Sequence, residues 1–282
     1  MAIRKNILLS FSLLIINIMY ITTKLNPSNV EIAINCGGPE FRTKGGVIYQ
    51  KDKYFIGGEP SDFGMNSEIK NTKDKEIYQT ERWSTEDLIY NIPIKKEGKF
   101  VLVLKFSEVY FNNKGEKVFD FKLGDLTVLE GIDIYKKVGK NSAYDEFLPF
   151  EIKNNKMFFE GKQVDNGYDS DSKNIKITFV KKDQDNPKIN AILLVRGTLK
   201  DTDYEDYNRS QELLEKQKQE LDKKNREFQR MSKSIDFEDF EDDFTDDGKK
   251  YRVSNGIFSG QSLFLTLICI GFAYFFMFSK KR

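Results

Sequence analysis

The sequence predicts an all-β fold, a two-sheet β-sandwich, followed by a charged spacer and one C-terminal transmembrane helix. From residue 31 to residue 198, short runs rich in Val, Ile, Phe and Tyr recur between Gly, Asn and Asp, as in strands joined by tight turns. This region shows no convincing helical period. Residues 257–278 are almost wholly apolar, and as a helix they would span about 33 Å, enough for a bilayer core of roughly 30 Å.

The first residues, 1–23, have the form of a secretory signal peptide. Arg4 and Lys5 precede an apolar run from Ile7 to Ile21, which is the arrangement of such signals. An uncleaved anchor is the alternative, because no small-residue cleavage site is evident. The folded domain is expected to occupy residues 28–200.

About nine strands are expected in this domain. The run Phe100–Tyr110 is apolar on both faces, as in a central strand buried on two sides. A turn signal at 112–115 ends it, and Val118–Leu123 is expected to return as the next strand. Tight hairpin turns are expected at Gly124-Asp125 and Asn154-Asn155. The other expected strands are Ile32–Cys36, Ile77–Arg82, Leu126–Leu129, Phe147–Ile152, Lys156–Phe159, Ile175–Val180 and Ile189–Val195.

The spacer, residues 201–256, changes in composition along its length. Residues 201–234 are rich in Lys, Glu and Gln, with Leu214, Leu221 and Phe228 seven apart, which predicts a solvated helix or a weak coiled coil. Residues 235–247 are mostly acidic, and self-repulsion predicts a disordered segment, with a docking motif or a weak calcium site as alternatives.

One N-glycosylation sequon is present in the sequence, Asn208-Arg209-Ser210, and it falls in the spacer. Asn208 is therefore a candidate glycan acceptor.

The apolar run 257–278 is followed by a basic tail, residues 279–282, of the kind found on the cytoplasmic side of a membrane. Together with the signal peptide, this run predicts a single-pass type I membrane protein with most of the chain in the lumen. Lys280 gives only a partial dilysine retrieval signal, because Ser279 precedes it.

Composition excludes several kinds of site. The chain has no histidine, which removes Ser-His-Asp and Cys-His catalysis and metal sites built on imidazole. With 45 basic and 44 acidic residues, the net charge of +1 gives no reason to expect nucleic-acid binding. Cys36 lies in the domain and Cys269 in the expected span, so they cannot pair within one chain, and Cys36 is expected to be buried. No metal or cofactor is expected.

A glycosidase that uses two carboxylates is the one enzymatic alternative that this composition leaves open. Its candidate acids are Glu81, Glu108, Asp120, Asp145, Glu146 and Asp185.

Several short motifs occur in one order between about residues 31 and 200. They are Ile34-Asn35-Cys36-Gly37-Gly38, Ser61-Asp62-Phe63-Gly64-Met65, the segment from Tyr78 to Trp83, Asn91-Ile92-Pro93-Ile94, the segment from Leu102 to Phe111, Lys117-Val118-Phe119-Asp120, Gly131-Ile132-Asp133-Ile134 and Asp185-Asn186-Pro187-Lys188. Their order and spacing together resemble the malectins, membrane-anchored lectins of the endoplasmic reticulum. The resemblance implies a sandwich like that of carbohydrate-binding modules and non-enzymatic binding of glucosylated glycans, with a preference for the diglucosylated high-mannose N-glycan.

The resemblance also implies a set of sugar-binding residues. In malectins two tyrosines, a Tyr-Phe pair and an aspartate surround a disaccharide, and the matching positions here are Phe63, Trp83, Tyr110, Phe111 and Asp185. Aromatic rings suit the apolar C–H faces of a pyranose, and a carboxylate accepts from its hydroxyls.

Two of these five positions depart from the family pattern, because Phe63 and Trp83 stand where malectins usually have tyrosine. Each lost hydroxyl that touched sugar would weaken binding by up to roughly tenfold, so altered affinity and relaxed linkage choice are expected.

Structural roles are the alternatives for the same residues. Phe63 and Trp83 would be core residues. Tyr110 and Phe111, as neighbours on a strand, would point to opposite faces, with Phe111 packed more deeply. Asp185 would cap the turn before Asn186-Pro187.

Partners and location are implied by the resemblance alone. They are the membrane of the endoplasmic reticulum, a role in early glycoprotein quality control, and association with the ribophorin I subunit of oligosaccharyltransferase. A cell-surface receptor or adhesin with the same sandwich is the non-enzymatic alternative.

Overall fold

The computed structural model describes residues 25–234, and residues 25–218 form one compact unit. The expected signal peptide, acidic segment 235–247 and membrane span 257–278 lie outside the described residues. Among helices of the described part, none combines the length and apolar character needed to cross a membrane.

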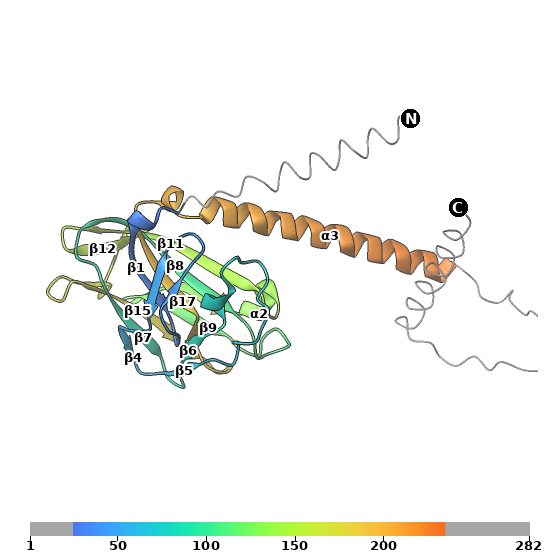
Figure 1. Ribbon diagram of the computed structural model, residues 1–282, viewed down its shortest axis with the longest axis horizontal. Helices are drawn as coiled ribbons and strands as arrows, with labels where there is room; N and C mark the ends of the chain where they lie inside the picture. Colours follow the sequence, from blue (N-terminus) through green and yellow to red (C-terminus); the bar gives the residue numbers. More distant parts are fainter. Residues whose placement is uncertain (1–24, 235–282) are drawn as a thin grey trace, which may run out of the picture. The chain divides into compact units, whose positions relative to one another are not determined.

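Two β-sheets, in which most neighbouring strands are antiparallel, make up most of the domain (Figure 1), and this confirms the expected β-sandwich. The larger sheet has the strand order β13-β12-β11-β8-β17-β1-β3-β2 and the smaller sheet the order β10-β9-β15-β7-β4, with β14 paired to β15. The strands of the larger sheet are β1 (Val30–Asn35), β2 (Phe41–Arg42), β3 (Ile48–Lys51), β8 (Gly98–Ser107), β11 (Ala143–Lys153), β12 (Lys156–Phe159), β13 (Lys162–Val164) and β17 (Ala191–Arg196). Those of the smaller sheet are β4 (Phe55–Ile56), β7 (Leu88–Pro93), β9 (Phe119–Leu123), β10 (Leu126–Ile132), β14 (Tyr168–Asp169) and β15 (Asn174–Val180).

A third, three-stranded sheet and several helices complete the described structure. The sheet has the order β16-β6-β5, formed by β16 (Lys188–Ile189), β6 (Glu81–Trp83) and β5 (Glu59–Ser61). The helices are the short 3₁₀ helices η1 (Pro27–Asn29), η2 (Lys75–Tyr78) and η3 (Leu199–Asp201), and the α-helices α2 (Ile134–Val138) and α3 (Tyr204–Ser234).

Strand β8 lies between two hydrophobic clusters, as its sequence predicts. Phe100, Leu102, Leu104 and Phe106 belong to the core between the two large sheets, which also holds the buried Cys36. Val101 and Val103 alternate with them and pack into a second cluster on the outer face of the larger sheet. The predicted two-sided burial of this strand and the predicted burial of Cys36 are confirmed.

Both predicted hairpin turns are present. Gly124-Asp125 joins β9 to β10, where Leu123 pairs with Leu126. Asn154 and Asn155 join β11 to β12 with φ of 53° and 57°, the left-handed values that a two-residue turn of this kind requires and that asparagine tolerates.

Three strand predictions are wrong. The strand expected to end at Tyr110 ends at Ser107, and β9 does not return beside it, because β9 pairs with β10 and β15 in the other sheet. The strand expected at Ile77–Arg82 is the end of η2 followed by short β6, because the carbonyl of Tyr78 accepts hydrogen bonds from the side chains of Ser107 and Asn190 at 2.7 and 3.0 Å.

Several elements of the domain were not predicted. They include the short strands β2, β3, β4, β5, β13 and β14, the longer strand β7 (Leu88–Pro93) of the smaller sheet, and the five-residue helix α2.

Candidate functional site

The chain leaves β8 through a turn that the carboxylate of Glu108 holds in place. Glu108 is 1% exposed, and its Oε1 accepts the backbone N–H groups of Tyr110 and Phe111 at 2.8 and 3.1 Å. Because two successive N–H groups point at the same carboxylate oxygen, side chains no longer alternate between the two faces of the strand from here on. The expectation that these two side chains point to opposite faces is therefore wrong, because their rings meet edge to face with centroids 5.0 Å apart.

Phe63 extends this pair of rings to three. It follows β5 in the sequence, and its ring lies 5.2 Å from that of Tyr110 in an edge-to-face contact. Phe63 is 62% exposed and Tyr110 60% exposed, so the core alternative for Phe63 is wrong. Phe111 is half-buried, and so it is packed more deeply than Tyr110, as expected.

The loop that carries Phe63 is held close to the others by a glycine. A Cβ on Gly64 would lie 2.8 Å from the carbonyl oxygen of Gln79 and 3.2 Å from a methyl of Val109. No side chain fits between these segments, so Gly64 allows the loop after β5 to rest against the end of β8.

Lys117 connects the rings to Asp185. Its Nζ lies 5.5 Å from the ring centroid of Phe111, pairs with the carboxylate of Asp185 and donates to the carbonyl of Asn186 at 3.0 Å. The side chain of Lys117 is 9% exposed, whereas that of Asp185 is 31% exposed. The aspartate is thus fixed from the protein side and keeps an open side toward solvent, in place of the turn-capping role weighed for it.

Trp83 stands apart from this group. It is half-buried at the end of β6, opposite Glu59 on β5 and Lys188 on β16. Among the described residues, its indole makes no ring contact with Phe63, Tyr110 or Phe111. Its connection to the site is through the backbone, because the N–H of Ser84 donates to the carbonyl of Pro187 at 3.2 Å, two residues after Asp185.

Beside Trp83 lies a buried charge pair. Lys188 is 1% exposed, and its ammonium contacts the carboxylate of Glu81, two residues before Trp83 on the same face of β6. This pair neutralises both groups, so Glu81 serves to seat β6 against β16.

Four of the five predicted residues therefore lie in one group, Phe63, Tyr110, Phe111 and Asp185, and Trp83 lies on the strand next to it. Sequence reasoning missed the two side chains that hold the group together, Glu108 and Lys117. The motif Lys117-Val118-Phe119-Asp120 was noticed, but nothing local indicates that its lysine faces an aspartate 68 residues away.

This arrangement offers exposed ring edges and faces beside one anchored carboxylate. Such a surface can stack on an apolar ligand face and accept hydrogen bonds from adjacent hydroxyls. The other acid of the group, Glu108, already accepts two backbone N–H groups with Oε1.

Asn208 lies in the second turn of α3 and is exposed. Its side-chain amide donates to Glu212 at 3.3 Å. Its glycosylation stays a prediction.

Comparison with known proteins agrees with this description. A family model for the malectin domain matches residues 30–192. Malectin-A of Xenopus laevis is 39% identical over 172 residues, which cover 60% of this chain and 60% of that protein. Malectin of Homo sapiens is 38% identical over 178 residues, which cover 62% of this chain and 59% of that protein. The chain thus spans about 60% of the length of these curated relatives.

Among solved structures, the ANXUR2 extracellular domain of Arabidopsis thaliana superposes with a TM-score of 0.50 at 16% identity, covering 61% of this chain and 50% of that chain. This likeness concerns the fold alone. The family match is the stronger finding, because it extends over more than half of the 282 residues. The chain belongs to the malectin-domain family.

Proposed function

We propose that this domain is a lectin that binds glucosylated glycans at the group formed by Phe63, Tyr110, Phe111 and Asp185, with Trp83 at its border. The observation that carries the proposal is the exposure of Phe63 and Tyr110, 62% and 60%, in direct contact with each other. Two large rings kept in water at the end of a sandwich need a partner surface, and the apolar face of a pyranose is one that aromatic rings fit.

The aspartate supplies the polar half of such recognition. A charge-assisted hydrogen bond from a sugar hydroxyl to a fixed carboxylate is stronger than one between neutral groups. The contact with Lys117 holds Asp185 in one position, so the ordering of this side chain is completed before the ligand arrives.

Binding without catalysis is the part of the proposal that concerns reaction chemistry. A two-carboxylate glycosidase needs one acid free to donate a proton and one free to attack or activate water. Of the two acids at the ring group, Glu108 is 1% exposed and engaged with the backbone, and Asp185 is engaged with Lys117. These engagements support a lectin over a hydrolase.

The finer aspects of the proposal rest on family membership. They are a preference for the diglucosylated high-mannose N-glycan, a part in early glycoprotein quality control, residence in the membrane of the endoplasmic reticulum as a single-pass type I protein, and association with the ribophorin I subunit of oligosaccharyltransferase. Microscopy of a tagged copy tests the proposed location in the endoplasmic reticulum, since a signal at the plasma membrane would favour a receptor or adhesin.

A calorimetric titration of the protein with nigerose, maltose and methyl α-mannoside tests the binding proposal. The two glucose disaccharides are expected to bind and the mannoside to give no heat above dilution. Tyr110→Ala is expected to abolish binding, while Tyr54→Ala, which removes a 37%-exposed ring elsewhere on the domain, is expected to leave it intact. Equal binding by both variants, or release of free glucose, would contradict the proposal.

A further inference from the structure

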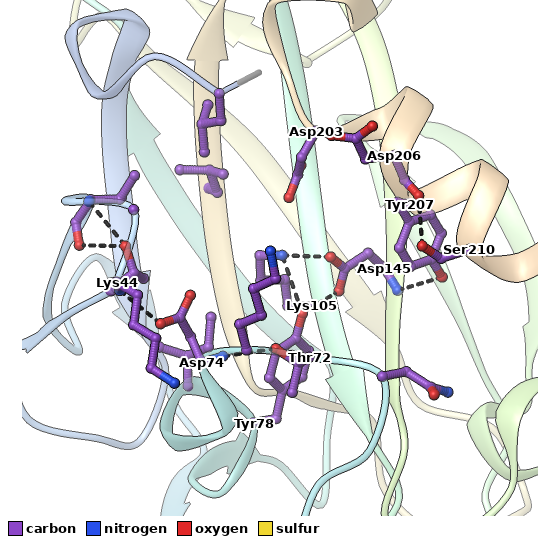
Figure 2. A pocket seen from close by; sticks show the side chains of 18 of the residues that line it. Lys44, Thr72, Asp74, Tyr78, Lys105, Asp145, Asp203, Asp206, Tyr207 and Ser210 are labelled. Carbon is purple, nitrogen blue, oxygen red and sulfur yellow. Dashed lines mark hydrogen bonds and ion pairs between the residues drawn. The ribbon is translucent and has the colours of Figure 1, made fainter. Parts of the chain in front are cut away.

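A cavity of about 700 Å³ lies on the outer face of the larger sheet, under the beginning of α3 (Figure 2). Strands β3, β8, β11 and β17 contribute its floor through Tyr49, Lys105, Asp145 and Leu193. Residues 203–217, which lead into and form the first turns of α3, contribute its opposite wall. Among its described lining residues, none belongs to the loops that carry Phe63, Tyr110 or Asp185, so the cavity is separate from the proposed lectin site.

The floor contains a buried ion pair. Lys105 and Asp145 are each 6% exposed, and Nζ of Lys105 lies 2.5 Å from Oδ2 of Asp145 and 3.2 Å from the hydroxyl of Tyr78. That hydroxyl donates to the other oxygen of Asp145 at 2.7 Å. Burial by itself lowers the pKa of the Lys105 ammonium, but Asp145, Tyr78, Tyr49 and Asp203 together outweigh it and raise the pKa, so the lysine stays charged.

Two more carboxylates, at the start of α3, line the cavity (Figure 2). Oδ1 of Asp203 and Oδ2 of Asp206 are out of contact with solvent and have no hydrogen-bond donor in the described part of the chain. Arg209 reaches the other oxygen of Asp206 only at 3.8 Å and its side chain is 65% exposed. A buried carboxylate oxygen without a donor is unfavourable, because it has lost its water without replacement.

The charges at this end of the cavity do not balance. Four carboxylates, those of Asp74, Asp145, Asp203 and Asp206, line the cavity with one buried ammonium, that of Lys105; the other two lysines of its lining, Lys44 and Lys73, are exposed. The charge of Asp203 is felt at the floor, since after burial itself it is among the causes that raise the pKa of Asp145. An additional positive charge would be attracted here and would supply the missing donors.

The rest of the lining limits what can carry that charge. Apolar surface from Tyr49, Ile77, Leu193 and Leu214 leads to the carboxylates, and this suits an aliphatic stem. A bare metal ion does not fit, since no three acidic, cysteine or histidine side chains of the described residues are arranged to ligate one. We propose that this cavity is a second binding site, which takes an ammonium or guanidinium group on an apolar stem and pairs it with Asp203 and Asp206.

Such a group has two sources, a free alkylamine or the Lys or Arg side chain of a peptide. NMR titration of the full-length chain in a neutral detergent distinguishes them. The probes are n-pentylammonium, with 1-pentanol as its uncharged counterpart, and the capped tripeptide Leu-Lys-Leu, with Leu-Gln-Leu as its counterpart. The backbone signals of Leu193, Asp203 and Tyr207 report occupancy, because these residues line the cavity.

The charged probes are expected to shift these signals saturably and the uncharged ones to leave them unchanged. The variant Asp203→Asn should weaken binding at least fivefold, since it keeps the shape of the side chain and removes its charge. Glu215→Gln, which makes the same change at an exposed position of α3 outside the cavity, should change it less than twofold. If the tripeptide binds tenfold more tightly than the amine, the natural ligand is a protein segment. If the amine binds tenfold more tightly than the tripeptide, the natural ligand is a small amine.

The proposal is overturned if pentanol binds as tightly as pentylammonium, if both variants weaken binding equally, or if neither charged probe shifts the signals. Binding of maltose to the same protein is read independently at the signals of Phe63 and Tyr110. Failure of the cavity proposal and failure of the lectin proposal are therefore distinguishable.

Discussion

Lys117 and Asp185 lie 68 residues apart and form an ion pair at the edge of the ring group. The lysine is 9% exposed and also donates to the carbonyl of Asn186, while Asp185 has a left-handed backbone with φ of 53°. The ammonium thus holds both the side chain and the backbone of the segment that precedes β16. In the proposed lectin site, Lys117 is a positioning residue that works through the aspartate.

Replacing Lys117 by methionine is expected to weaken glucose-disaccharide binding by about tenfold, or ~1.4 kcal/mol. The aspartate would keep its charge but lose its fixed position, so part of the binding free energy would go into ordering it. Calorimetric titration with nigerose measures the effect. Lys114→Met, at an exposed position of the same connection, is the matched control and should bind like the parent chain. Equal affinity of both variants would remove Lys117 from the site.

Two substitutions of Phe63 are expected to change the affinity for sugar in opposite directions. Phe63→Ala should weaken binding by about tenfold through loss of the ring contact and the stacking surface, with a change in unfolding free energy within about 0.5 kcal/mol because the side chain is 62% exposed. Phe63→Tyr adds the hydroxyl that malectins usually have at this position and should strengthen binding by up to about tenfold. Titration with maltose and thermal unfolding read the two quantities separately. A tyrosine variant that binds more weakly than the parent would show that the phenyl edge faces an apolar group.

Gly64 is predicted to matter for binding more than its size suggests. In Gly64→Ala the new methyl would meet the carbonyl of Gln79 at 2.8 Å, which forces the loop that carries Phe63 away from the end of β8. We expect lost contact between Phe63 and Tyr110 and at least tenfold weaker binding. Gly45→Ala is the control, since its nearest neighbour would be 3.9 Å away. The measurements are disaccharide titration and thermal unfolding of both variants. If the two variants bind alike, loop placement does not depend on this close approach.

Stability is expected to fall above about pH 10. Burial raises the pKa of Tyr49 and of Tyr90, so the folded state keeps protons that the unfolded state releases near pH 10. The stabilisation is fully present below that pH and is lost as the pH rises toward the folded-state values, by about 1.4 kcal/mol per pH unit for each group.

Urea unfolding between pH 8 and pH 11 measures this slope. Tyr49→Phe should reduce the loss above pH 10 by about 1.4 kcal/mol per unit and leave the slope between pH 8 and pH 9 unchanged. An unaltered slope above pH 10 in the variant would mean that Tyr49 ionises in the folded protein as readily as in the unfolded one.

Features that depend on neighbours in the chain were predicted well. The alternation within Phe100–Phe106 fixed both the strand and its two buried faces, and Asn154-Asn155 identified a tight turn because few other residues tolerate its backbone. The five site positions came from resemblance, and their types, aromatic and acidic, suit the proposed ligand. Local pattern could not show that Tyr110 and Phe111 leave the strand, because the cause is a side-chain oxygen of Glu108 turned toward their N–H groups.

Segments that pair with distant parts of the chain could not be predicted in the same way. Ile77–Arg82 has the composition of a strand, but its course depends on Tyr78, which bonds to Asp145 at a separation of 67 residues. Lys105 meets Asp145 because β8 and β11 are neighbours, and Asp203 and Asp206 line the same cavity because α3 begins beside these strands.

Periodicity, turn residues and composition thus established from the amino-acid order alone that this is a β-sandwich without histidine chemistry. The pairing of Lys117 with Asp185, the contact of Phe63 with Tyr110 and the separation of Trp83 from both follow from the order of strands in three sheets. The physical reason is the sequence separation over which each effect acts. Backbone propensity depends on a few neighbouring residues, whereas these contacts join distant segments that only the packing of the whole domain brings together.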